Sequence, residues 1–257
     1  MRRYYVIYPV LKGGNNIKLE PNNFCPEQST IWSFPDRGNW ATHSGGYRGN
    51  WSPYVPRNLI LRYSRPGDWI LDQFVGSGTT LIEAKLLNRK AIGVDINQHA
   101  ISISEKNLEF KNNSSKNIYI KYGNATDLFF IKDNAIDFIC THPPYANIIK
   151  YSDGLNGDIS LMDIAEFLES MRYVAKESYR VLKRSKFCAI MIGDVRKKGK
   201  VIPLGFELMK CFLDEGFILK EIIIKEQHNC RGTTKWENKK RNFLMLAHEY
   251  IFVFQKI

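Results

Sequence analysis

The stretch WILDQFVGSGTT, residues 69–80, decides the fold. Its first part is apolar and predicts a strand from Trp69 to Gln73, the Gly-Ser-Gly segment predicts a turn, and the residues from Thr79 to about Leu87 predict a helix. Glycines let the backbone approach a ligand closely, and a helix N-terminus carries partial positive charge. This strand, turn and helix are therefore typical of a site for a nucleoside-type ligand.

Strands and helices alternate after this stretch. We expect strands at 91–94, 118–122, 136–140, 187–192, 219–225 and 245–254, and helices at 98–109, 160–182 and 204–215. Ser160 and Asp163 have the spacing of a capping box at the start of the longest helix. Because most strands are apolar on both faces, the pattern predicts an α/β fold with a doubly wound, mostly parallel sheet of about seven strands.

The N-terminal part of the chain shows no sustained periodicity. Residues from about 13 to 57 are rich in Gly, Asn, Pro and Trp, and they contain a short echo, RGNW at 37–40 and 48–51. Their aromatic residues argue against disorder, so we expect an ordered lid. We predict a lid and ligand-covering segment at 1–57, with a helix starting near Pro56, and a catalytic domain at 58–257 with small loops for nucleic acid, the whole forming one compact unit.

Composition narrows the class of protein. With 257 residues, of which 44% are hydrophobic, the chain can bury a substantial core. A net charge of +11 favours a polyanionic partner such as nucleic acid. Five scattered cysteines predict neither a disulfide framework nor a metal site. No apolar run is long enough to cross a membrane and no signal peptide is visible, so we expect a cytoplasmic protein.

The first candidate site follows the central strand. In a doubly wound sheet, ligands bind beyond the carboxyl ends of the strands, where Gly76 and Gly78 lie. Asp95, after the next strand, is placed to accept hydrogen bonds from ribose hydroxyls. A dinucleotide fingerprint would need a glycine at Leu81, and a phosphate loop would need a lysine that is absent here. S-adenosylmethionine, a nucleoside with an amino-acid end and no phosphate, fits this pattern.

The second candidate site is THPPY, residues 141–145, directly after the strand at 136–140. It therefore emerges at the same edge of the sheet. Prolines have no N–H, so nearby carbonyls stay free to accept hydrogen bonds. Together with the side chain of His142, such a carbonyl could accept the hydrogens of an exocyclic amino group, and Tyr145 offers a ring on which a base can stack. An isolated Pro-Pro can also simply end a strand.

The segments FVGSGTT at 74–80 and HPPY at 142–145 resemble the cofactor motif and the Pro-Pro-Tyr catalytic motif of DNA amino-methyltransferases, which modify N6 of adenine or N4 of cytosine. The resemblance extends from about Trp32 to the C-terminus, including residues 56–72 and 248–250. It implies a Rossmann-like methyltransferase fold, S-adenosylmethionine as cofactor, a base flipped out of double-stranded DNA, and a restriction-modification setting. The catalytic residues it implies are His142, Pro143, Pro144 and Tyr145. The cofactor-binding residues expected are Pro56, Asp72, Phe74, Gly76, Gly78, Thr79, Thr80, Asp95, Ile96, Asn124 and Asp127.

Several residues depart from the family pattern. The family usually has Asp, Asn or Ser at the position of His142, so a neutral imidazole nitrogen must act as the acceptor here. By contrast, Thr141 resembles the residue found at this place in the cytosine-modifying members, which slightly favours cytosine N4 over adenine N6 as the target. Gln73 stands in place of a proline, and Asn124 in place of an aspartate near the adenine ring, with Asp127 as a substitute carboxylate.

Two basic segments follow strands at the same edge and predict DNA contacts. One is the run after Gly193, and the other is 225–241, which holds six basic and two acidic residues among polar and aromatic ones. Such mixtures suit phosphate positioning with some base contact. The predicted DNA-binding residues are Arg196, Lys197, Lys198, His228, Asn229, Arg231, Lys235, Trp236, Lys239, Lys240 and Arg241.

Two other functions stay open from the sequence. An RNA base amino-methyltransferase would use the same motif pair, and a non-catalytic basic DNA-binding subunit could keep a degenerate methyltransferase fold. A nicotinamide dehydrogenase is disfavoured, because the third glycine is missing. The chain leaves little room for a separate target-recognition domain, so a homodimer or a companion restriction endonuclease also stays open as a partner.

Overall fold

The apolar run Trp69–Asp72 forms strand β2 inside an eight-stranded sheet with the order β1-β9-β10-β6-β5-β2-β3-β4. The computed structural model describes residues 18–111, 117–146, 151–152, 154–228 and 242–257. Within these ranges, β10 is the one strand of the sheet that runs antiparallel to its neighbours. None of the helices in the described part of the chain is both long and apolar enough to span a bilayer.

The elements have the following bounds. The sheet consists of β1 (Ile31–Trp32), β2 (Trp69–Asp72), β3 (Lys90–Asp95), β4 (Ile118–Tyr122), β5 (Ile136–Thr141), β6 (Leu182–Ile192), β9 (Ile218–Glu226) and β10 (His248–Gln255). A separate hairpin pairs β7 (Val195–Lys197) with β8 (Lys200–Ile202). The helices are α1 (Tyr54–Tyr63), α2 (Thr79–Leu86), α3 (Gln98–Asn107), the 3₁₀ helix η1 (Ile159–Leu161), α4 (Ile164–Val181) and α5 (Leu204–Asp214).

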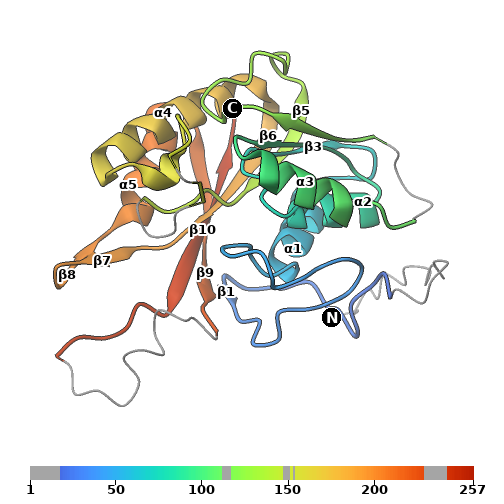
Figure 1. Ribbon diagram of the computed structural model, residues 1–257, viewed down its shortest axis with the longest axis horizontal. Helices are drawn as coiled ribbons and strands as arrows, with labels where there is room; N and C mark the ends of the chain where they lie inside the picture. Colours follow the sequence, from blue (N-terminus) through green and yellow to red (C-terminus); the bar gives the residue numbers. More distant parts are fainter. Residues whose placement is uncertain (1–17, 112–116, 147–150, 153, 229–241) are drawn as a thin grey trace.

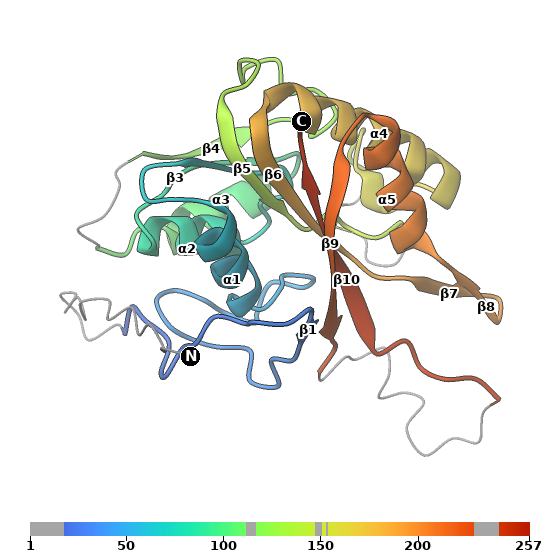
Figure 2. The same ribbon diagram turned by 180° about the vertical axis from the view of Figure 1, so that it is seen from behind.

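Helices cover both faces of the sheet. Figures 1 and 2 show α1, α2 and α3 on one face and α4 and α5 on the other. Two apolar cores fill these two layers, one between the sheet and α4 and α5, the other between the sheet and α1 and α2. The prediction of a doubly wound, mostly parallel α/β fold is therefore confirmed.

The structure corrects several details of that prediction. The sheet has eight strands rather than about seven, because Ile31–Trp32, inside the segment expected to be irregular, pairs with β9. Strand β6 begins at Leu182, five residues before the expected start at Phe187, and β10 begins at His248 rather than Met245. The helix expected from Pro56 begins at Tyr54, so the predicted boundary at residue 57 falls inside α1.

The longest helix also begins later than expected. Asp163, and not Ser160, is the N-cap of α4, and its side chain accepts from the backbone N–H groups of Ala165 and Glu166. The capping box is completed by Glu166, whose side chain accepts from the N–H of Asp163. Ser160 lies in the preceding η1. A carboxylate pair at this spacing satisfies more free N–H groups than a serine would, which places the helix start at residue 164.

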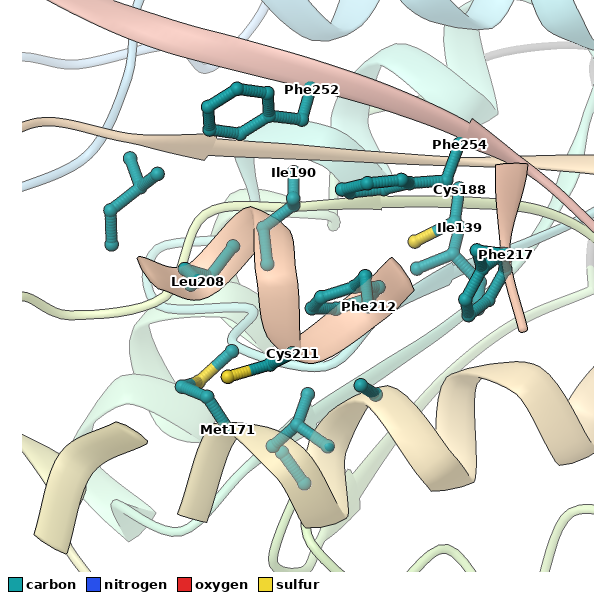
Figure 3. Close-up of a cluster of buried hydrophobic side chains, with 14 of the residues drawn as sticks. Ile139, Met171, Cys188, Ile190, Leu208, Cys211, Phe212, Phe217, Phe252 and Phe254 are labelled. Atoms are coloured by element: carbon teal, nitrogen blue, oxygen red, sulfur yellow. The ribbon is translucent and has the colours of Figure 1, made fainter. Parts of the chain in front are cut away.

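The core beneath α4 and α5 is dominated by aromatic rings from β10. Phe252 and Phe254 of β10 alternate with Ile251 and Val253, which are buried in the core on the opposite face of the sheet. On the α5 side, Phe212 stacks on Phe254 with 4.9 Å between ring centroids. Figure 3 shows Phe252, Phe254 and Phe212 in one cluster with Ile190 of β6. Because all of these side chains are fully buried, β10 is held firmly between β6 and β9.

The echo in the N-terminal segment produces two similar turns. Gly38 and Gly49 both have left-handed backbone angles, with φ of 86° and 83°. A Cβ on Gly38 would meet the Trp40 ring at 2.3 Å, and one on Gly49 would meet the Tyr151 hydroxyl at 1.7 Å. Only glycine fits either position.

A buried ionic cluster fastens this segment to the helices. Glu83 of α2 is fully buried and accepts from Trp40 Nε1 and His43 Nε2, both at 2.7 Å. Its second oxygen accepts from the guanidinium of Arg57, which is 2.9 Å away on α1 and also pairs with Glu20. Burial raises the pKa of Glu83, but Arg57 and the other donors outweigh burial and hold it below its usual value. The N-terminal segment is thus tied to the helix that follows the glycine turn.

We predict that Glu83→Gln lowers the free energy of unfolding by about 3 kcal/mol, because it leaves the buried Arg57 without its main counter-charge. Urea unfolding followed by circular dichroism measures this. Glu169→Gln is the matched control, since the side chain of Glu169 is 63% exposed and its ion pair with Arg172 spans 3.8 Å. That change should cost under about 1 kcal/mol. Equal losses in the two variants would contradict a structural role for the cluster.

Candidate active site

The carboxyl ends of the parallel strands meet at one edge of the sheet, and two adjoining hollows lie there. We call the first the inner cavity. It lies over the glycine turn and is lined by Tyr47, Gly49, Asn50, Trp51, Asp72, Gln73, Phe74, Val75, Gly76, Ser77, Thr79, Asp95, Ile96, Asn97, Gly123, Asn124, Ala125, His142, Pro144, Tyr151, Gly157, Asp158 and Ile159. We call the second the outer groove. It opens beside HPPY and the start of β10.

The two hollows share a wall. Gly49, Asn50, Trp51, His142, Pro144 and Tyr151 line both. A ligand in the inner cavity would therefore meet a ligand in the outer groove at His142 and Pro144.

The glycine turn is held against β3. Gly76, with φ of 50°, donates its backbone N–H to Asp95 Oδ2 at 2.9 Å, and the other oxygen of Asp95 accepts from Asn97 N–H at 2.9 Å. Burial raises the pKa of Asp95, against the lowering effect of these N–H groups. Gly78, with φ of 85°, begins α2, and a Cβ there would meet the hydroxyl of Ser104 at 2.5 Å. Both glycines are required by the backbone.

Asp72 joins the glycine turn to the HPPY loop. Its Oδ2 accepts from Thr80 Oγ1 at 2.5 Å, and its Oδ1 accepts from Thr141 Oγ1 at 2.7 Å and from Phe74 N–H at 3.1 Å. The carboxylate is 3% exposed, and burial raises its pKa to about 6, although the hydrogen bonds oppose the rise. Asp72 thus sets the distance between α2 and the residue before His142.

Asn124 lies on the far wall of the inner cavity, in the loop after β4. Its Oδ1 accepts from Thr126 N–H at 3.0 Å, so the amide nitrogen is the group left for a ligand. A Cβ on Gly157 would approach that nitrogen at 3.1 Å. The amide therefore presents a hydrogen-bond donor, where an aspartate would present an acceptor.

The N-terminal segment covers the inner cavity. The ring of Tyr47 lies over Gly76, where an added Cβ would be 3.2 Å from it, and its centroid is 6.3 Å from that of Tyr151. Asn50 donates to Ser77 Oγ of the glycine turn at 3.2 Å. Residues before α1 thus form one wall of the site, together with Trp51.

The HPPY loop is linked by hydrogen bonds to the start of β10. Tyr145 donates its hydroxyl hydrogen to Glu249 Oε1 at 2.5 Å, and Nε2 of His142 lies 3.2 Å from the same hydroxyl. Lys225 of β9 pairs with Glu249 Oε2 at 3.2 Å. On its other side, His142 stacks on Trp51, with 5.5 Å between ring centroids and 21° between planes. Burial lowers the pKa of His142 to about 4, so the imidazole is neutral at neutral pH.

The outer groove is bordered by basic and aromatic residues. Arg196 of β7 lines it, stacks over Phe243 at 4.8 Å and donates to the carbonyl of Leu244 at 3.1 Å. His228 also lines it and lies 2.9 Å from Ser33 Oγ. Lys197 and Lys198 are exposed on the hairpin beside it. Asn229, Arg231, Lys235, Trp236, Lys239, Lys240 and Arg241 lie outside the described residues.

Most of the predicted site residues meet at these two hollows. Asp72, Phe74, Gly76, Thr79, Asp95, Ile96 and Asn124 line the inner cavity, and His142, Pro143, Pro144 and Tyr145 line the outer groove.

Four residues predicted to hold the cofactor do not line the inner cavity. Pro56 is buried inside α1, Gly78 faces Ser104, and Thr80 lies beneath Asp72. Asp127 is exposed and accepts from Phe129 N–H, so it does not replace the family aspartate.

Sequence reasoning missed residues that arrive from distant parts of the chain. Tyr47, Trp51, Tyr151 and Asp158 line the inner cavity, and Glu249 and Lys225 hold Tyr145. The RGNW echo was the available signal for Trp51, since the repeated motif places a tryptophan after each left-handed glycine. Among the described residues, no group of three His, Cys, Asp or Glu side chains is arranged to hold a metal ion.

Comparison with known proteins agrees with this geometry. A family model described as DNA methylase matches residues 11–106 and 136–257. The chain belongs to the DNA methylase family. Its HPPY loop and glycine turn are the motifs expected of the branch of this family that methylates amino groups. A second model, an RMKL-like methyltransferase domain, matches residues 60–182.

Two relatives illustrate the range of sequences that resemble this chain. It is 31% identical over 113 residues to the type II methyltransferase M2.DpnII of Streptococcus pneumoniae, covering 44% of this chain and 39% of the relative. It is 33% identical over 125 residues to a tRNA (guanine(10)-N2)-dimethyltransferase of Methanothermobacter thermautotrophicus, covering 48% of this chain and 35% of the relative. The match thus spans less than half the length of either relative.

Solved structures share the fold of this chain. A SAM-dependent methyltransferase from Methanosarcina mazei superposes with a TM-score of 0.54 at 17% identity, over 77% of this chain and 97% of that one. At this identity the likeness concerns the architecture alone.

The inner cavity suits S-adenosylmethionine, the cofactor of this family. Among the described residues that line it there is no lysine or arginine, and there are three aspartates, Asp72, Asp95 and Asp158. A phosphate-bearing nucleotide would need cations, whereas a ligand with sulfonium and ammonium groups is stabilised by carboxylates. Asp95 would hold the ribose, Asn124 the adenine, and the N-terminus of α2 the carboxylate.

We predict a pH effect on stability from His142. Burial lowers its pKa to about 4 in the folded chain, against an ordinary histidine pKa of 6.5, so the unfolded chain binds more protons between these pH values. The contribution of neutral His142 to the free energy of unfolding is therefore full above pH 6.5 and is lost as the pH falls toward 4. His142→Asn should remove about 1 to 2 kcal/mol of the stability difference between pH 7 and pH 5. Urea unfolding at both pH values measures it, and an unchanged difference would show that the ring titrates normally.

Proposed function

We propose that this DNA methylase transfers a methyl group from S-adenosylmethionine to the exocyclic amino group of a base flipped out of double-stranded DNA. The shared wall of the inner cavity and the outer groove carries the proposal, because His142 and Pro144 face both hollows. A base in the groove and a methyl donor in the cavity would meet there. A base inside a duplex cannot reach such a wall, so it must leave the stack.

The chain's part in the reaction is positioning and electrostatics. The cofactor supplies an electrophilic sulfonium methyl group. His142 and nearby carbonyls of the HPPY loop accept the amino hydrogens, so that the nitrogen lone pair points to the methyl carbon. Bound in the inner cavity, S-adenosylmethionine would supply the methyl carbon for a new N–C bond and would keep the electron pair of the broken C–S bond on sulfur, while the proton lost by the amino group would pass to solvent water. No covalent adduct with the base is needed, and Cys140 is fully buried in β5.

We propose N4 of cytosine as the first target to test, with N6 of adenine as the alternative. The sequence feature that favours cytosine is Thr141. Its hydroxyl donates to Asp72 and so holds the residue directly before the HPPY loop in place.

The outer groove and the β7–β8 hairpin are the proposed DNA surface. Arg196 and His228 line the groove, and the exposed hairpin adds Lys197, Lys198 and Lys200 at its rim. Cations at the rim neutralise phosphates, while the aromatic interior accepts a base. We propose a restriction-modification setting, in line with the type II methyltransferases among the relatives.

A second candidate substrate is RNA. The tRNA (guanine(10)-N2)-dimethyltransferase that this chain resembles favours it. Both substrates present an exocyclic amino group, so the same wall would serve either.

We predict that His142→Ala and Tyr145→Ala each lower methyl transfer by at least about 100-fold, because each removes a group that orients the amino nitrogen. S-adenosylmethionine affinity, measured by calorimetry, should stay within a few fold. Labelled cofactor with separate DNA and tRNA pools, followed by mass spectrometry of nucleosides, identifies the product. Full activity in both variants would overturn the proposed site, and label in tRNA alone would replace DNA by RNA.

We predict that changing Lys197 and Lys198 together to Ser weakens DNA binding roughly equally for all sequences and reduces the salt slope of the affinity by up to about 2. Fluorescence anisotropy at several salt concentrations measures both. Lys210→Ser with Lys220→Ser is the control, since these residues lie on α5 and β9 away from the groove. Identical slopes in the wild type and the hairpin variant would exclude the hairpin.

A further inference from the structure

His142 differs from an Asp, Asn or Ser at the same position, because an imidazole can accept a hydrogen bond through only one of its two nitrogens. A neutral imidazole has one nitrogen with a hydrogen and one without, and only the bare nitrogen can accept an amino hydrogen. The protein must therefore select one tautomer. The surroundings of the ring show how it does so.

The contacts that join Glu249, Tyr145 and His142 determine which imidazole nitrogen carries the hydrogen. Tyr145 has one hydroxyl hydrogen, and Glu249 Oε1 at 2.5 Å takes it, because an ionised carboxylate can only accept. The hydroxyl oxygen then has only lone pairs for Nε2 of His142 at 3.2 Å. For that contact to be a hydrogen bond, Nε2 must carry the hydrogen, and Nδ1 is left bare.

Glu249 is held ionised and in place by its neighbours. Its backbone lies opposite Lys225 in the β9–β10 register, and the ammonium group pairs with Oε2 at 3.2 Å. Burial raises the pKa of Glu249, but the charge of Lys225 and the hydrogen bond from the Tyr145 hydroxyl oppose burial, and the pKa lies below its usual value. Gly193 makes room for the contact, since a Cβ there would lie 3.3 Å from Tyr145 and 3.4 Å from Glu249.

The ring of His142 is also fixed in orientation. Trp51, which is 5% exposed, stacks on one face of the imidazole, and Tyr145 meets it edge-on at 5.6 Å. A ring flip that exchanged the two nitrogens would break the contact with Tyr145. No described residue forms a hydrogen bond with Nδ1, and the ring borders both the inner cavity and the outer groove.

We propose that Glu249, acting through Tyr145, is a positioning residue that fixes His142 as the tautomer with hydrogen on Nε2, and so presents Nδ1 as the acceptor for the target amino group. This rests on the proposed function for the role of Nδ1, whereas the tautomer itself is a property of the protein alone. The other tautomer would point an N–H at the amino hydrogens and repel them. Glu249 thus allows the imidazole of His142 to act as the hydrogen-bond acceptor at a position where other members of the family have an oxygen acceptor.

Glu249→Gln should reverse the tautomer. The amide oxygen would face Lys225, which needs an acceptor, and the amide NH₂ would donate to the Tyr145 oxygen. The Tyr145 hydrogen would then turn to Nε2 of His142, and the ring hydrogen would move to Nδ1. Glu207→Gln is the control, because it removes one carboxylate from the exposed face of α5.

Nitrogen NMR of protein labelled with ¹⁵N-histidine tests this directly, with His142→Gln to assign the signals. We expect a bare Nδ1 and a protonated Nε2 for His142 in the wild type and in Glu207→Gln, and the reverse in Glu249→Gln. Tyr145→Phe, which removes only the hydroxyl, should give a mixture. A protonated Nδ1 in the wild type, or an unchanged tautomer in both Glu249→Gln and Tyr145→Phe, would overturn the proposal.

Methyl transfer supplies the second readout. In Glu249→Gln, kcat should fall about 100-fold while the Kd for S-adenosylmethionine stays unchanged, a loss typical of one misplaced acceptor. Thermal unfolding shows whether the variant is folded. The expected tautomer with no methylation of any nucleic acid would reject the proposed function and leave the tautomer assignment standing. Active wild type with unchanged kcat in Glu249→Gln would reject the positioning role.

Discussion

The buried carboxylate of Asp72 is the constraint on which the rest of the site depends. It ends the central strand β2 and accepts hydrogens from Thr80 at the start of α2 and from Thr141 at the end of β5. The first contact fixes the helix whose N-terminus faces the inner cavity, and the second fixes the strand that delivers His142. Because a buried carboxylate is costly without such partners, the three elements are held in one arrangement.

Residues from both the N-terminal and the C-terminal parts of the chain complete the site around Asp72. The N-terminal segment contributes Tyr47 and Trp51, and the buried cluster around Glu83 ties that segment to α2. At the other end, Glu249 reaches the HPPY loop because β10 enters the sheet in the reverse direction, so that its first residues lie beside the last residues of β6 and β9. The acceptor His142 is thereby gripped between Trp51 and Tyr145.

The sequence was sufficient for the parts of the molecule whose signals are local. The apolar run at β2, the glycine turn, and the strand before HPPY each carry their own pattern, and strand direction then brings Gly76 and His142 to one edge. Contacts across the chain carry no such pattern. Glu249 is one acidic residue on an apolar strand, and only the register with Lys225 and the reach of Tyr145 give it a role. Likewise Asp127 matched a spacing, but the turn after Asn124 directs it to solvent.

The reversed strand also has a consequence for biosynthesis. The lining of the inner cavity ends at Ile159, whereas the acid that orders the acceptor lies at position 249. On a ribosome, all residues that line the inner cavity are therefore synthesised well before β10, which lies between β6 and β9. Because β1 and β9 join the rest of the sheet only through β10, this end of the sheet can be completed only after the last strand has been synthesised.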